Sequence, residues 1–151
     1  SDAAPYIATY LDRFPGIRTY MNDAREFARE HLYVETLFGR RIHIEQIGAS
    51  NQAMRGFSER QAINAPIQGS AADIIKRAMV CLPEELSAQG LAADMLLQVH
   101  DELIFEVPEK QAEQSVQLIK SVMENAALPI VQLSVPLVVD AGIADSWSEA
   151  H

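Results

Sequence analysis

The stretch LQVHDELIFEV, residues 97–107, sets three polar residues inside an otherwise apolar run: His100, Asp101 and Glu102. Aliphatic and aromatic residues on both sides are typical of β-strands, and Asp is a favoured turn residue. The pattern predicts two strands, residues 95–99 and 103–107, joined by a turn at the polar tripeptide. Because the arms are apolar at nearly every position, we expect both faces of these strands to be buried.

Two interpretations of the polar tip stay open at this point. The tripeptide can be an ordinary hairpin turn, since Asp is common in turns. Alternatively, the tip presents two carboxylates and an imidazole at one end of a sheet. That arrangement suits Mg²⁺, which prefers oxygen ligands and is held by one or two carboxylates plus phosphates. Because adjacent strand residues point to opposite faces, we expect one of Asp101 and Glu102 to be the main ligand and the other an accessory.

The first 50 residues contain two helical patterns and a β-rich segment. Apolar residues recur at helical spacing over residues 2–14 and 17–31, with Pro15-Gly16 between them, so we expect a helical hairpin. Ser1-Asp2 is a plausible cap for the first helix. Residues 33–47 are rich in strand-forming residues around Gly39, which predicts a short β-hairpin.

A cap signal in residues 48–51 introduces a long helical pattern that contains a proline. Pro66 has no N–H and disfavours the helical conformation for the residue before it, so we expect the helix over residues 52–63 to break or kink there and to resume over residues 67–82. A shorter helix to Ala88 should follow, ended by Gly90. Further on, the spacing predicts a helix over residues 109–126 and a strand over residues 133–142, at an edge or bulge because of Pro136.

A polar stripe is predicted on this long helix. Arg60, Asn64 and Gln68 follow one another at intervals of four residues, so they share one helix face. A solvated face is the plain interpretation of such a stripe. The alternative is contact with nucleic acid, because a guanidinium reaches phosphates and amides reach minor-groove acceptors that all base pairs share.

Composition limits the class of protein. The chain has 151 residues, of which 48% are hydrophobic and 22% charged, as in a soluble globular domain. No apolar run is long enough to cross a bilayer and nothing resembles a secretory signal, so we expect a cytoplasmic protein that makes no membrane contact. The single cysteine, Cys81, excludes an internal disulfide, and the four histidines lack zinc-site spacing. Because the first residue is Ser1 and not Met, we expect a piece of a longer protein.

The formal charge of −9 is unevenly distributed. Residues 1–82 carry ten Lys and Arg against nine Asp and Glu, whereas residues 83–151 carry two against twelve. A polyanionic partner should therefore lie along the first half of the chain. The basic side chains that we expect nearest to such a partner are Arg40, Arg41, Arg55, Arg60, Lys76 and Arg77.

Four segments together resemble the bacterial DNA polymerase I group of family A DNA polymerases. They are YVETLFGRR (33–41), ERQAINAPIQGSAADIIKRAM (59–79), LLQVHDELIFEVP (96–108) and VPLVVDAGIADSW (135–147). They follow one another in the order expected of the C-terminal part of such enzymes. The resemblance implies an α+β fold, with helices packed on a small antiparallel sheet of the palm. It also implies two subdomains: residues 1–48 as the end of the fingers, and residues 49–151 as the DNA-cleft helix and C-terminal palm.

The resemblance also implies catalytic roles at the polar tip. Asp101 matches the palm aspartate that binds the catalytic Mg²⁺ ions, and Glu102 matches the neighbouring acidic residue that supports the metal site. His100 matches a residue near the primer terminus. In the parent enzyme these residues would serve Mg²⁺-dependent transfer of nucleotides from dNTPs to a primer 3′ end, in DNA replication and repair at the bacterial nucleoid.

The stripe acquires a DNA-binding role from the same resemblance. Arg60, Asn64 and Gln68 match residues that contact the template and primer strands, with the amides in the minor groove beside the terminal pair. Arg55 matches a phosphate contact. The implied partners are therefore primer–template duplex DNA and a dNTP.

The chain departs from the family pattern in ways that matter for activity. The family holds two metals with two aspartates from separate strands, and only one matches here. The motif of the other aspartate, the nucleotide-binding fingers helix and the thumb have no counterpart, so we expect the isolated chain to be inactive. A non-catalytic DNA-binding remnant and a purely structural fragment remain alternatives. A missing partner strand would also leave an apolar sheet edge, which predicts homo-oligomers or strand exchange.

Overall fold

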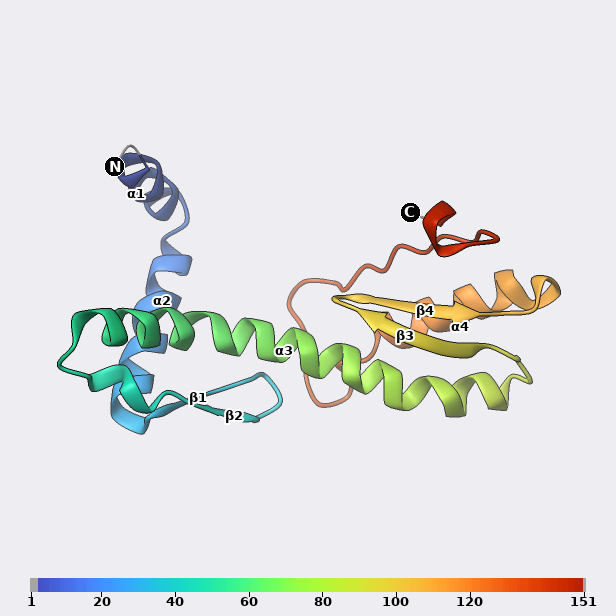
Figure 1. Cartoon of the computed structure of the whole chain (residues 1–151), viewed down its shortest axis with the longest axis horizontal. Helices are drawn as coiled ribbons and strands as arrows, with labels where there is room; N and C mark the ends of the chain where they lie inside the picture. The colour runs from blue at the N-terminus through green and yellow to red at the C-terminus, as the bar shows by residue number, and fades with distance from the viewer. Residues whose placement is uncertain (1–2, 151) are drawn as a thin grey trace. The chain divides into compact units, whose positions relative to one another are not determined.

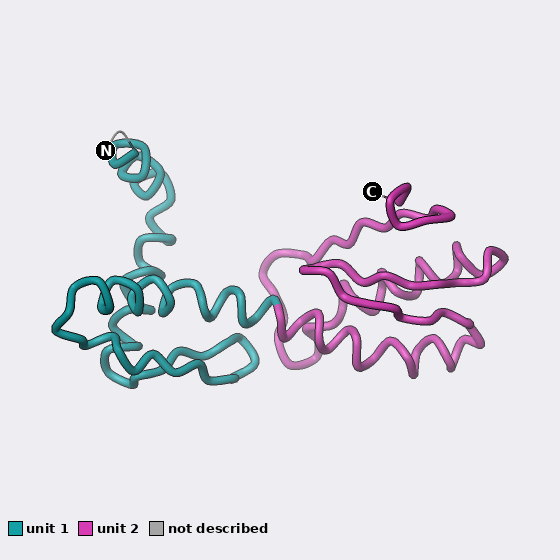
Figure 2. Tube along the Cα trace, in the orientation of Figure 1, with its two compact units in different colours: residues 1–71 teal, residues 72–151 magenta. Residues whose placement is uncertain are grey.

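The computed structural model describes residues 3–150, so the predicted cap at Ser1-Asp2 lies outside the described part. The chain divides into two compact units, residues 1–71 and residues 72–151 (Figure 2). Helices and small antiparallel sheets make up both units, which confirms the predicted α+β class. None of the helices in the described range is both long enough and apolar enough to span a membrane.

The first unit begins with two helices, α1 (Ala4–Arg13) and α2 (Pro15–His31), which meet at a corner (Figure 1). Phe14 separates them, and Pro15 takes the first helical position, where its fixed φ suits the helix and its missing N–H costs nothing. Arg18 pairs with Asp12 across the corner at 2.6 Å. The expected pair of helices is present, but α1 buries none of its residues.

A short β-hairpin follows α2, as predicted. Strands β1 (Tyr33–Glu35) and β2 (Arg41–His43) pair antiparallel with Val34 opposite Ile42. A 3₁₀ turn, η1 (Glu45–Gly48), then leads to the long helix α3 (Gln52–Ala88), whose first turn is capped by the Asn51 carboxamide. The core of this unit consists of Ala28, Val34, Ile44, Ile47 and Ala62.

We predicted a break or a kink at Pro66, and the break is wrong, because α3 runs without interruption through both Pro66 and Pro83. A proline inside a helix removes one hydrogen bond and crowds one carbonyl, at a cost of about 3 kcal/mol. Packing offsets this cost, since Ala62 and Leu82 are fully buried on α3. The separate short helix predicted before Ala88 is therefore the last part of α3, and Gly90 ends it with a φ of 66°, as expected.

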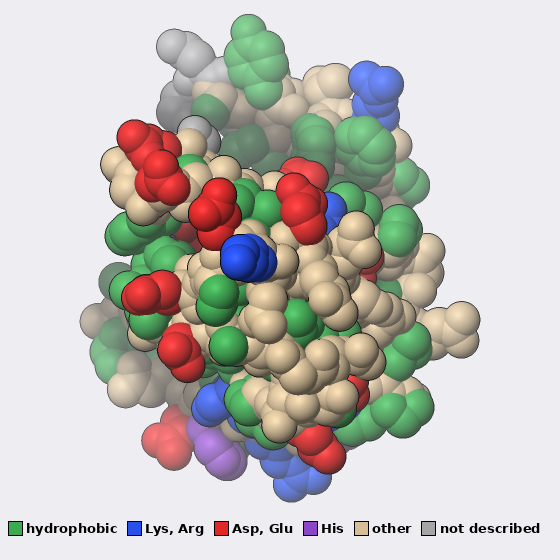
Figure 3. All heavy atoms as spheres, turned by 90° about the vertical axis from the view of Figure 1, so that its right-hand side faces the viewer, with side chains coloured by type: hydrophobic (Ala, Val, Ile, Leu, Met, Phe, Trp, Pro, Cys, Tyr) green, Lys and Arg blue, Asp and Glu red, His purple; other side chains and the backbone are tan. Residues whose placement is uncertain are grey.

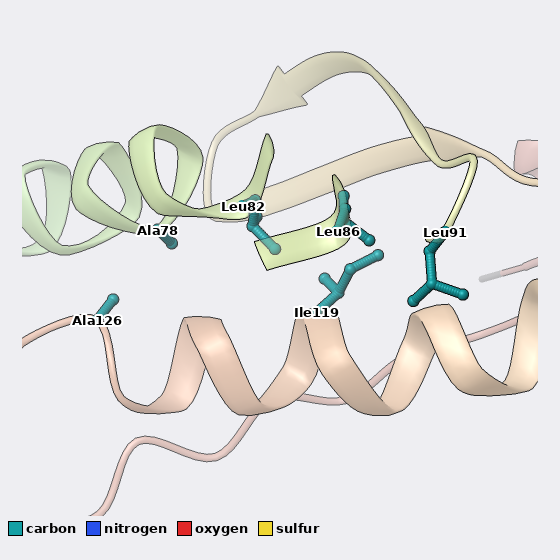
Figure 4. Close-up of a cluster of buried hydrophobic side chains, with 6 residues drawn as sticks. All are labelled: Ala78, Leu82, Leu86, Leu91, Ile119 and Ala126. Carbon is teal, nitrogen blue, oxygen red and sulfur yellow. The ribbon is translucent and has the colours of Figure 1, made fainter. Parts of the chain in front are cut away.

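The second unit pairs its half of α3 with a hairpin and a second helix. Strands β3 (Asp94–Val99) and β4 (Glu102–Glu106) are antiparallel, and η2 (Glu109–Gln111) leads into α4 (Ala112–Glu124). In Figure 4 the side chains of α3 and α4 point toward one another, with Leu91 beside them. This core consists of Ala78, Leu82, Leu86, Leu91, Ile119 and Ala126.

Two further predictions for this unit are wrong. Residues 133–142 form no strand, because Pro136 has no donor and no described strand pairs with them. The hairpin is also not buried on both faces, since Leu96 and Leu97 are 54% and 44% exposed. Within residues 3–150 the hairpin is a two-stranded sheet, and only α3 and α4 contribute helical residues to its core. The last element of the described residues is a 3₁₀ turn, η3 (Trp147–Glu149).

The surroundings of Tyr20 lead us to expect that the stability of the first unit depends on pH. Its hydroxyl donates to the Ile63 carbonyl at 2.7 Å, and burial raises the pKa of the Tyr20 phenol above its ordinary value of 10.0. We expect Tyr20→Phe to lower the free energy of unfolding by about 1 kcal/mol at pH 8. The contribution of the phenol is fully present below pH 10.0 and is lost as the pH rises through the raised folded pKa, because the unfolded chain loses its proton first.

The measurement is urea unfolding of both proteins from pH 8 to pH 11, in which the difference between them should shrink above pH 10. Tyr10→Phe is the matched control, because Tyr10 lies exposed on α1. A difference between wild type and Tyr20→Phe that stays constant over this range would contradict the assignment.

Candidate functional site

The polar tip is a two-residue turn that presents Asp101 to solvent. Val99 pairs with Glu102 at the end of the ladder, so His100 and Asp101 alone form the loop. His100 has a φ of 53°, a left-handed conformation that is uncommon outside glycine. The Gln98 carboxamide donates to the His100 carbonyl at 2.7 Å and holds the turn. Both loop side chains are exposed, whereas Glu102 begins β4 and is half-buried.

The three predicted tip residues follow one another at the end of the hairpin, but their surroundings differ. Asp101 is exposed and Glu102 is half-buried at the start of β4, and carboxylate oxygens are ligands that suit Mg²⁺. Within the described residues no three His, Cys, Asp or Glu side chains gather as a metal site. The tip fits part of a Mg²⁺ site, and further ligands would have to come from elsewhere.

The predicted stripe exists as one face of α3. Because the helix continues through Pro66, Arg60, Asn64 and Gln68 keep their helical spacing, and all three are exposed. No hydrogen bond within residues 3–150 engages their side chains. These residues are available to a partner along a single helix face.

Several arginines that we expected near a polyanion are held by the chain itself. Arg55 donates to the Ala49 carbonyl at 2.9 Å, and Arg41 pairs with Glu35 at 3.0 Å. Arg77 donates to the carbonyls of Ala126 and Leu128 at the end of α4. The sequence shows the charge of an arginine but not its partner, so these internal roles were not predictable.

The structure also joins the β1–β2 loop to α3 beside the stripe. Leu37 donates its backbone N–H to the Ser70 hydroxyl at 2.9 Å, and Arg40 donates to the Gly69 carbonyl at 3.1 Å. Gly69 and Ser70 are buried in this contact. Sequence reasoning missed this contact, although the small residue pair after Gln68 was a signal that something approaches the helix closely.

Electrostatics separate the two groups of residues. Figure 3 shows acidic side chains across its face of the molecule with few basic ones among them. Residues 83–151, which contain the tip, carry twelve acidic residues against two basic ones. The stripe belongs to the first unit and the tip to the second. The stripe, which contains Arg60, and the acidic tip are thus divided between the two units.

The sequence model of DNA polymerase family A matches residues 1–149. The chain belongs to DNA polymerase family A. It is 55% identical over 153 residues to the DNA polymerase I of Rhizobium leguminosarum, and 50% identical over 150 residues to that of Pseudomonas aeruginosa.

These matches cover 100% and 99% of this family A chain but only 15% and 16% of the two relatives. The chain therefore spans about a sixth of the length of the curated relatives that it matches. Among solved structures it resembles the POL domain of Pol1 from M. smegmatis, a complex with a DNA primer-template and dNTP. That likeness has a TM-score of 0.92 at 44% identity, over 99% of this chain and 26% of the other.

The left-handed residue in the turn yields a stability prediction for this family A hairpin. Glycine adopts a positive φ without the strain that His100 bears, which is about 1 kcal/mol. Glycine at either loop position also raises the conformational entropy of the unfolded chain, which lowers the free energy of unfolding. Asp101→Gly is therefore the control, because it has this effect but relieves no strain. We expect the unfolding free energy of His100→Gly to exceed that of Asp101→Gly by about 1 kcal/mol. Equal values in urea unfolding would show that the turn is unstrained.

Proposed function

We propose that this chain is part of a DNA-directed DNA polymerase that adds nucleotides from dNTPs to a primer 3′ end during DNA replication and repair. The match of the family A model over residues 1–149 carries this proposal, because it includes both the polar tip and the stripe. The M. smegmatis structure, a complex with a primer-template and dNTP, supports the same partners. The bacterial nucleoid, where DNA lies, is the proposed place of action.

In this proposal residues 1–48 belong to the end of the fingers, and residues 49–151 supply the cleft helix and the C-terminal palm. The compact units divide later, at Ala71, inside α3. The two divisions differ because α3 lies wholly within residues 49–151, whereas its Ala62 packs in a core with residues of the proposed fingers segment.

Asp101 is the proposed main metal ligand, with Glu102 as an accessory. When bound, Mg²⁺ neutralises charge on the phosphates and activates the primer hydroxyl. The two-residue turn holds the Asp101 backbone directly beyond the last pair of the hairpin, Val99 and Glu102, which supports this role. His100 is exposed beside it, which supports its proposed contact with the primer terminus.

The stripe is the proposed DNA-binding surface. Arg60 would contact phosphate, and the amides of Asn64 and Gln68 would accept and donate hydrogen bonds in the minor groove beside the terminal base pair. The absence of internal hydrogen bonds to these side chains in the described part favours this role. Arg55 remains a proposed phosphate contact, although its guanidinium already bonds the Ala49 carbonyl.

The catalytic proposal is tested by Asp101→Ala in the complete polymerase that contains this chain. Loss of the carboxylate should reduce nucleotide incorporation by about 10⁴-fold or more, while leaving primer–template affinity within a few fold. Single-turnover incorporation and DNA binding are measured side by side. Asp94→Ala is the control, because Asp94 is an exposed carboxylate at the other end of the same hairpin.

Near-normal turnover in Asp101→Ala would overturn the role of the tip. Equal losses in Asp101→Ala and Asp94→Ala would mean that the hairpin acts only through its stability. If the complete protein binds DNA in a salt-dependent way but never incorporates nucleotides, the chain serves a non-catalytic DNA-binding protein instead.

We further propose that the isolated chain self-associates through the β3–β4 hairpin. Its backbone edges are unpaired within the described residues, and Leu96 and Leu97 are exposed beside them. An exposed apolar edge is a template for pairing with a second strand. A second copy of the chain supplies one.

This proposal predicts a concentration-dependent dimer in gel filtration with light scattering. Leu97→Lys should shift the chain toward the monomer, because a charged side chain on an edge opposes pairing. Val80→Lys is the control, since Val80 is 76% exposed on α3 and lies outside the sheet. A strict monomer at high concentration would rule the proposal out.

A further inference from the structure

We propose that the loop between β1 and β2, residues 36–40, sets the position of Gln68 by locking onto α3 at the next two residues. Thr36, Gly69 and Ser70 are positioning residues in this scheme. The inference rests on the proposed contact of Gln68 with the primer terminus. All of its contacts lie inside the first unit.

Gly69 is the point of closest approach. A Cβ at this position would lie 2.7 Å from the Thr36 methyl, 3.1 Å from Ile42 Cδ1 and 3.2 Å from Arg40 Nη2. The distance to the Thr36 methyl is shorter than any normal contact between two carbon atoms. The ends of the Ile42 and Arg40 side chains are also closer than most contacts of a Cβ. Only glycine lets the loop reach the helix backbone here.

Ser70 and Arg40 fasten the loop at two further points. The Ser70 hydroxyl accepts the Leu37 N–H at 2.9 Å and donates to the Pro66 carbonyl at 2.6 Å. Arg40 Nη2 donates to the Gly69 carbonyl at 3.1 Å. Thr36 and Ser70 are only 5% and 7% exposed, so water competes little for these bonds.

The loop is stiff enough to act as a support. The Thr36 hydroxyl accepts the N–H groups of Phe38 and Arg40, at 3.3 and 3.2 Å. The Thr36 backbone also bonds to Arg40 and Gly39, each at 3.0 Å. The loop is therefore fixed within itself before it meets the helix.

The support acts where α3 most needs it. Pro66 cannot donate a backbone hydrogen bond to the Ala62 carbonyl, so the turn just before Gln68 lacks one internal bond. Gln68 is exposed and immediately precedes Gly69, so any rotation or bend of this turn redirects its amide. A side chain that reads a base edge must be held within about 0.5 Å, which a turn weakened by proline needs outside help to achieve.

The test is Gly69→Ala in the complete polymerase that contains this chain. The readout is the ratio of extension rates for matched and mispaired primer termini, with KM and kcat determined separately. We expect Gly69→Ala to lower this ratio by about tenfold, the scale of loss that a misplaced binding group causes. In a Gln68→Ala background, which already lacks the amide, Gly69→Ala should cause no further change.

Two variants separate positioning from general damage. Gly56→Ala makes the same change in the same helix, but its Cβ meets only the end of the Arg60 side chain at an ordinary 3.7 Å, so the ratio should not change. Adding Thr36→Ser to Gly69→Ala removes the clashing methyl and keeps the hydroxyl, so it should restore most of the ratio. If Gly69→Ala fails to fold, Ser70→Ala replaces it, because it removes the hydroxyl that bonds Leu37 and adds no bulk. Its effect on the ratio should likewise be absent in a Gln68→Ala background.

The outcomes distinguish the two proposals. An unchanged ratio in Gln68→Ala alone would overturn the proposed primer contact. If Gln68→Ala lowers the ratio, and Gly69→Ala and Ser70→Ala lower it further by the same factor with or without Gln68, the lock is overturned and the primer contact of Gln68 stands. Loss of both effects in the double variants, with rescue by Thr36→Ser, would establish the lock.

Discussion

The continuity of α3 is the constraint on which both halves of this chain depend. The helix supplies Ala62 to one hydrophobic core, and Ala78, Leu82 and Leu86 to the other. Each unit therefore folds around its own part of a single helix, and neither hairpin has another helix of comparable length to pack on. This explains why two prolines are tolerated: the lost hydrogen bonds cost a few kcal/mol, whereas a break would uncouple side chains from two cores.

Local chemistry made several features predictable. The β-hairpin at Gly39, the end of α3 at Gly90 and the turn at His100-Asp101 all depend on residues that act through their own backbone conformation or side chain. The stripe of Arg60, Asn64 and Gln68 was predictable for the same reason, because helical spacing alone puts the three on one face. At each of these positions the signal and its structural effect lie within a few residues.

Features that depend on distant partners were not predictable. A strand over residues 133–142 needs a neighbouring strand for its hydrogen bonds, and apolar sequence cannot supply one. The same holds for Leu96 and Leu97. Their apolar side chains indicate burial, but both are exposed and no described residues cover them. The lock at Gly69 joins residues more than 25 positions apart, so only a short Gly-Ser signal marked it in the sequence.

The acidic character of the second unit bears on the proposed chemistry. The nucleoside triphosphate proposed as substrate would meet the carboxylates of Asp101 and Glu102 within a segment that carries twelve acidic residues and two basic ones. The phosphates and the carboxylates repel one another, and the repulsion strengthens when water is excluded. An anionic substrate can therefore approach the tip only with cations between them, which is the role proposed for Mg²⁺. The hairpin would contribute the proposed oxygen ligands, and the basic side chain proposed to lead the DNA-binding stripe, Arg60, lies instead on the first unit.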